Sequence, residues 1–169
     1  MNQDYNRKKT GLMQFSDWVT LITGLMVLFI TIMVSYDVLM RYFFDEPQLF
    51  VDDLTSFVLV AIIFLGAGPV FYRGGHIRVD LLTSHLKSKT QKQLRAITLL
   101  IGITFLGIVT YQTVVSTITA FQTGRVTSVM NYPLWIGMLF VPIGSMLLLF
   151  FMFVELFNIF IENVKISKD

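Results

Sequence analysis

The chain has 169 residues, of which 54% are hydrophobic and only 14% are charged, and its formal net charge is +2. Soluble domains carry roughly 25% charged residues, so this composition leaves too little charge to cover a water-soluble globule. Cysteine is absent, which excludes disulfides and thiolate metal sites. The composition therefore predicts an all-α integral membrane protein, and the length favours a single domain over residues 1–169.

Stretches free of Asp, Glu, Lys, Arg and His mark the candidate spans, since crossing a bilayer takes about 20 mostly apolar residues. They cover residues 18–36, 54–72, 96–124 and 126–154. The first is too long for a signal-peptide core, and no small-residue cleavage site follows it, so we expect it to be retained. The last contains a turn-like start before Pro133, a residue that first helical turns tolerate. We predict transmembrane helices at about 15–42, 51–72, 93–123 and 133–162.

The positive charges are distributed unevenly between the two sides that these helices would define. All but two of the 13 Lys and Arg residues fall in the N-terminal segment, the C-terminal segment or the loop between the second and third helices. Only Arg41 and Arg125 fall on the other side. Because Lys and Arg concentrate in short cytoplasmic loops, we predict that both termini and the middle loop are cytoplasmic.

The middle loop, at about 73–92, has a pattern of its own. Val79, Leu82 and Leu86 would share one face of a short helix, and basic residues flank it. This pattern predicts an amphipathic segment at the cytoplasmic membrane interface, with packing on a partner subunit as the alternative. His76 and His85 lie in the same loop without a nearby cysteine, so we do not expect a metal site.

Several ionisable residues lie near the predicted helix ends. Asp37 and Arg41 are four residues apart, which on a helix predicts an ion pair. The alternative is an anchor to a partner subunit or to the acids of the second helix. Asp17 is interpreted as a helix cap, and Glu155 as a side chain that reaches the lipid headgroups.

The segment between the first and second helices is acidic. Its acids could favour the positive dipole end of the second helix, or they could form a docking surface for an external partner, and the two roles are compatible. The residues concerned are Asp45, Glu46, Asp52 and Asp53.

The third predicted helix carries small and hydroxylated residues at near-helical spacing, with amides at Gln112 and Gln122. Such residues let membrane helices approach closely and form hydrogen bonds, so a packing stripe is favoured over a pore lining. The sequence contains no nucleotide-binding or serine-hydrolase motif. It also lacks matching broken helices in two halves, the usual pointer to a transport site. The packing residues are Gly102, Thr110, Thr113 and Thr117.

Three blocks together resemble a known family. They are Arg-Tyr-Phe-Phe at 41–44 with the acidic pair at 52–53, Gly-His-Ile-Arg-Val-Asp at 75–80, and Pro-Leu-Trp at 133–135 with Pro-Ile-Gly at 142–144. In this order, with four spans, the chain resembles over nearly its whole length the small membrane subunit of tripartite ATP-independent periplasmic (TRAP) transporters. The family more often has Glu at the acidic pair, a departure that leaves the charge intact.

The resemblance implies a role within a three-part secondary transporter of the bacterial inner membrane. A periplasmic binding protein would capture an organic acid, and a large membrane subunit would hold the substrate and sodium sites and move like an elevator. This chain would form a heterodimer with the large subunit, surrounded by membrane lipids, and enlarge its static scaffold. The substrate would be a C4-dicarboxylate or sialic acid, the latter favoured by overall likeness alone. No cofactor, catalysis or nucleic-acid partner is expected.

The resemblance also implies roles for matched residues. Arg41, Asp52 and Asp53 would brace the outer face or dock a partner. His76, Arg78 and Asp80 would hold the interfacial segment, and Trp135 would mark the outer membrane boundary. The alternatives are a self-associating channel or exporter and a membrane enzyme or redox-cofactor anchor. The first is disfavoured because the charges lie near helix ends, and the second because both histidines lie in the loop.

Overall fold

A computed structural model describes residues 2–73 and 88–166, and these residues are almost entirely helical. Four helical segments are long and apolar enough to cross a membrane, so the expected all-α fold with four spanning helices is confirmed. The expected interfacial segment, with His76, Arg78, Val79, Asp80, Leu82 and Leu86, lies outside the described residues. The helices are α1 (Asn2–Phe43), α2 (Leu49–Tyr72), α4 (Ser88–Gln122), α5 (Leu134–Met138) and α6 (Phe140–Ile166).

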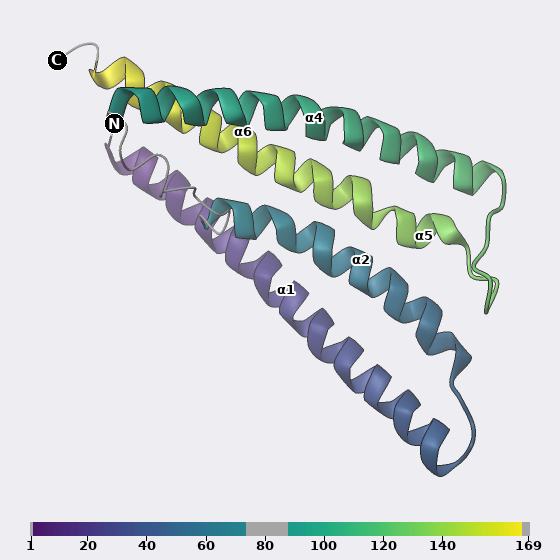
Figure 1. Ribbon diagram of the computed structural model, residues 1–169. Coiled ribbons are helices and arrows are strands. Elements are labelled where there is room, and N and C mark those ends of the chain that lie inside the picture. The colour runs from purple at the N-terminus through teal and green to yellow at the C-terminus, as the bar shows by residue number, and fades with distance from the viewer. Residues whose placement is uncertain (1, 74–87, 167–169) are drawn as a thin grey trace.

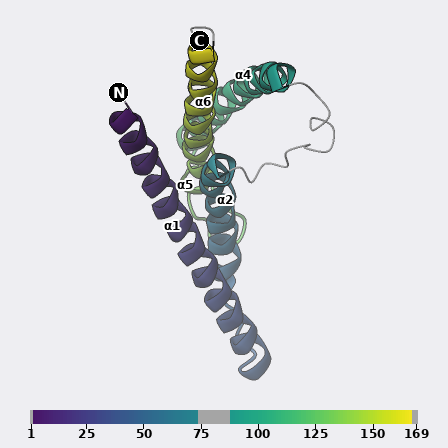
Figure 2. The ribbon, with the colours of Figure 1, turned by 90° about the vertical axis from the view of Figure 1, so that its left-hand side faces the viewer.

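The helices form a single layer in the order α1, α2, α6, α4 (Figure 1). The view along the layer shows α1 and α4 on opposite sides of α6 (Figure 2). We call the end with Asn2 and Ile166 the terminal end, and the end with the connections 44–48 and 123–133 the loop end. Because each helix packs mainly on its neighbours in the layer, α1 and α4 form two open edges.

Helix α1 begins at Asn2, well before the predicted start near residue 15. Asp17 therefore lies inside the helix, and its interpretation as a cap is wrong. Within the span, Ser16, Thr23 and Asp37 are buried on one face. Their separations are multiples of seven residues, the repeat that keeps one face of a helix against a neighbour.

Helices α2 and α6 share the most extensive interface, and glycines make it close. A Cβ built on Gly144 of α6 would collide with the backbone of Phe64, and one built on Gly137 of the adjoining α5 would collide with the Phe57 ring. Gly68 lies against Phe151, which is fully buried. Missing side chains thus let the two helix backbones approach each other, as small residues do in membranes.

The fourth predicted helix is divided into α5 and α6 just before Pro142. Proline has no backbone N–H, and its ring crowds the carbonyl four residues earlier, here that of Met138. The Thr117 hydroxyl of α4 donates to the Thr113 carbonyl at 2.8 Å, and it also lies 3.4 Å from the Met138 carbonyl oxygen, a weaker second contact. Because Pro142 has no N–H, the Met138 carbonyl oxygen at the break is left to contact α4.

Candidate functional site

Asp37 ties the connection 44–48 to α1. Its side chain is buried, and Oδ2 accepts a hydrogen bond from Arg41 Nη2 at 2.8 Å, the pair expected from the spacing. Oδ1 accepts a second bond from the backbone N–H of Gln48 at 2.7 Å. Gln48 is the N-cap residue of α2, and its own side chain makes no capping hydrogen bond. One carboxylate therefore neutralises a cation and fixes the start of the next helix.

Asp53 performs a similar task for the connection 123–133. It is 8% exposed, and its Oδ2 accepts bonds from the Thr127 hydroxyl at 2.6 Å and the Met130 N–H at 3.0 Å. Within this loop, the Tyr132 N–H donates to Thr127 Oγ1 at 3.0 Å. Gly124, at φ +61°, ends α4 in the left-handed conformation that glycine adopts without steric cost. Asp53 of α2 thus holds a loop that is distant in sequence.

Three further acids at the loop end are exposed and form no side-chain hydrogen bond or ion pair with any residue in 2–73 or 88–166. We call Asp45, Glu46 and Asp52 the acidic patch. Asp45 has φ +60°, which turns the chain away after α1. The structure thereby separates the predicted acids into two groups, because Asp37 and Asp53 serve internal contacts while the patch is open to a partner.

Replacing Asp37 by Ala should loosen the connection 44–48. The Gln48 N–H would lose its acceptor, and a partly buried donor left unpaired costs about 1–3 kcal/mol. We expect faster hydrogen exchange at Gln48 and the first turn of α2, measured by mass spectrometry in detergent. Glu46→Ala is the matched control and should leave exchange unchanged, because Glu46 is exposed and does not have a positive φ. Equal protection in wild type and Asp37→Ala would contradict the assignment.

Two ion pairs join helices near the terminal end. Asp17 of α1 pairs with Arg73, the residue that follows α2, and Arg95 of α4 pairs with Glu155 of α6. Glu155 therefore has a partner in the protein, in place of the predicted reach to headgroups. Both pairs are partly exposed, where ion pairs contribute about 0–1 kcal/mol. They align neighbouring helices rather than form a site.

The predicted packing residues of α4 lie toward α6. A Cβ on Gly102 would come within 2.7 Å of Met152 Cε, and Thr110 and Thr117 are each 6% exposed. The Thr113 hydroxyl donates to the carbonyl of Thr110 within α4 at 2.9 Å. Apart from the long bond from Thr117, these hydroxyls bond within their own helix, so close packing carries this interface.

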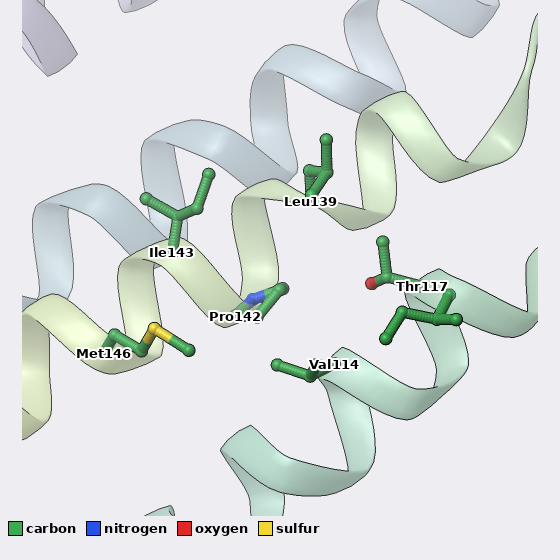
Figure 3. Close-up of a pocket in the computed structure, with 7 residues that line it drawn as sticks. Val114, Thr117, Leu139, Pro142, Ile143 and Met146 are labelled. Carbon is green, nitrogen blue, oxygen red and sulfur yellow. The ribbon is translucent and has the colours of Figure 1, made fainter. Parts of the chain in front are cut away.

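A shallow groove of about 190 Å³ lies between α4 and the start of α6 (Figure 3). In the close-up, Val114 and Thr117 face Pro142 and Met146 across the space. Almost all of its lining is apolar, so the groove lacks the charged groups that would hold an organic acid. Trp135, predicted as a membrane-boundary anchor, packs edge-on against Phe121 with 5.4 Å between ring centroids. This contact fastens α5 to the last turn of α4.

Several residues that are central in the structure were not predicted from the sequence. Gly137 and Gly144 are seven residues apart, so their shared helical face could have indicated the seam with α2. Met130 binds Asp53 through its backbone N–H, which any residue but proline offers, so no sequence signal could have identified it.

Comparison with known proteins identifies the family of this chain. No curated protein is similar enough to this chain to count as a match. A family model described as tripartite ATP-independent periplasmic transporters, DctQ component, matches residues 30–162. The match covers most of the chain, including Asp37, Asp53 and the α2–α6 seam. The chain therefore belongs to the DctQ family, the small membrane subunits of TRAP transporters.

Proposed function

We propose that this multi-pass membrane protein scaffolds the large transport subunit of a sodium-coupled, binding-protein-dependent importer of an organic acid. The substrate class is a C4-dicarboxylate or sialic acid. The chain lies in the bacterial inner membrane with the terminal end in the cytoplasm and the loop end in the periplasm. Eleven-to-two segregation of Lys and Arg supports this orientation, because only Arg41 and Arg125 lie at the loop end.

The single-layer arrangement is the observation that carries the scaffold role. A transport path needs polar groups gathered around a space, whereas each helix here packs mainly on its neighbours in one layer. The groove between α4 and α6 is almost wholly apolar. Apart from Asp52 in the first turn of α2, the charged side chains of the described spans are occupied in pairs or in loop contacts, as at Asp37 and Asp53. These features favour a scaffold subunit that packs beside a transporter over a subunit that carries the transport path.

Co-purification from mild detergent tests the scaffold role directly. We expect the tagged chain, expressed with the other components, to retain a large polytopic membrane protein at one-to-one ratio, identified by mass. In liposomes, the chain alone should transport nothing, while the pair with binding protein should accumulate substrate under a sodium gradient. A stable homo-oligomer that conducts or transports alone would overturn the proposal in favour of a self-sufficient channel or exporter.

The acidic patch is proposed to help dock the periplasmic binding protein. Reversing Asp45, Glu46 and Asp52 to Lys should lower uptake about tenfold at limiting binding protein, because complementary charge chiefly accelerates encounter. Added binding protein should restore the rate, and moderate salt should reduce the difference between wild type and variant. Gln122→Lys adds positive charge at the loop end outside the patch and should have little effect. Uptake unchanged by the triple reversal would remove the docking role.

A further inference from the structure

An amide in the middle of α4 has no partner within the described chain. Gln112 lies about four residues from the centre of the span Leu94–Gln122, or roughly 6 Å along the axis. The hydrocarbon core extends about 15 Å on each side of its midplane, so a glutamine side chain at this depth does not reach the headgroups. Gln112 is exposed, and its side-chain amide forms no hydrogen bond with any residue in 2–73 or 88–166.

Gln112 points away from the rest of the layer. At 100° per residue it shares a face with Ile101, Phe105 and Ile108, which are 65%, 68% and 65% exposed. Thr117, on the face toward α6, is buried. The amide is therefore presented at the open edge of the layer, where it would meet hydrocarbon if lipid alone surrounded α4.

The exposed threonines of α4 satisfy their own hydroxyls. The hydroxyls of Thr98, Thr104 and Thr119 each donate to the carbonyl four residues earlier, at 2.9 Å. Such bonds let a threonine face lipid without an unpaired donor. Gln112 makes no equivalent contact, although two amide donors and a carbonyl acceptor need partners in hydrocarbon.

The opposite edge of the layer, on α1, differs in chemistry. Its outward face is aliphatic, and the Thr31 hydroxyl near this face donates to the Val27 carbonyl. Between Leu21 and Ile32 nothing on that face requires a polar partner, so lipid can cover the middle of the span. Ser35 is exposed on the same face nearer the loop end, and its hydroxyl has no hydrogen bond within the described residues. The outward residues are Leu21, Leu25, Leu28, Ile32 and Leu39, all more than half exposed.

We propose that the α4 edge, formed by Ile101, Phe105, Ile108, Gln112 and Val115, packs against a transmembrane helix of the large membrane subunit. That helix presents a hydrogen-bonding group at the depth of Gln112. The inference rests on the proposed scaffold function. Since apolar surface gains little by leaving lipid, interhelical hydrogen bonds and close packing select membrane partners. The chain belongs to a family of multi-component transporters, so a different chain is the occupant that fits.

Photocrosslinking from the two edges locates the partner. A benzoylphenylalanine at Phe105, on α4, should crosslink to the co-expressed large subunit, with the product identified by mass. The same probe at Leu28, on α1, is the matched control and should give no protein adduct. Adducts to the large subunit from Leu28 and none from Phe105 would overturn the inference. Adducts from Phe105 only to a second copy of this chain, or only to lipid, would also overturn it.

Substitution of the amide tests the hydrogen bond itself. Gln112→Leu should weaken association with the large subunit about 3- to 30-fold, the range that one interhelical hydrogen bond supplies. Gln122→Leu, an equal change at the helix end, should leave association unchanged. Helix content and membrane level of both variants report folding. If wild type retains no large subunit, the scaffold proposal fails and this inference with it. If wild type and Gln112→Leu retain it equally, only this inference fails.

Discussion

Replacing Asp53 by Leu is expected to release the connection 123–133 and to lower the stability of the folded chain by about 2–4 kcal/mol. The change removes the charged acceptor of the Thr127 hydroxyl and the Met130 N–H, two part-buried bonds, and a hydrogen bond to a charged group contributes about 1.5–3 kcal/mol, less where the donor is partly exposed. For a chain of this size the unfolding midpoint should fall by about 4–16 °C. Thermal unfolding in detergent measures the stability, and hydrogen exchange at Met130 measures the loop.

Two comparisons separate the contact from general damage. Asp53→Asn keeps an oxygen that can accept both bonds, so it should retain most of the stability. Asp52→Leu alters the neighbouring exposed acid, and surface changes usually stay within about 0.5 kcal/mol. A midpoint for Asp53→Leu equal to that of Asp52→Leu would show that the carboxylate does not hold the loop.

Replacing Gly144 by Ala is expected to force α6 away from α2. The added Cβ would collide with the backbone of Phe64, which cannot move aside as a flexible side chain can. Overpacking a close interface costs about 1–3 kcal/mol and sometimes more, and a backbone obstruction belongs at the upper end. We expect a lower unfolding midpoint and less large subunit retained on co-purification.

Glycines elsewhere provide the controls. Gly107→Ala on α4 meets no atom within 4 Å, and alanine exceeds glycine in helix propensity by about 1 kcal/mol, so this variant should be as stable as wild type or more stable. The three atoms nearest the Cβ of Gly137→Ala all belong to the Phe57 ring, so Phe57→Ala, which removes them, should rescue it. Phe64→Leu should not rescue Gly144→Ala, since the obstruction includes backbone atoms. Rescue of both pairs would contradict a backbone seam.

The buried acids show which contacts the local sequence can predict and which it cannot. The pairing of Asp37 with Arg41 follows from their spacing on a helix, which fixes geometry without knowledge of neighbours. The pairing of Asp53 with Thr127 does not, because it joins residues 74 positions apart across two helices. From the sequence alone, Asp52 and Asp53 look equivalent, yet one is exposed and the other is buried.

The sequence by itself determined the four spans and the family, because bilayer thickness sets how long an apolar run must be to form a spanning helix. The expected stripe of Gly102, Thr110 and Thr117 likewise follows from helical periodicity, and these residues lie toward α6. Only the tertiary structure decided the single layer, the loop contacts of the buried acids and the outward direction of Gln112. Each of these features depends on which helix faces pack together. Periodicity shows which residues share a helix face, but it does not show which helix packs against that face.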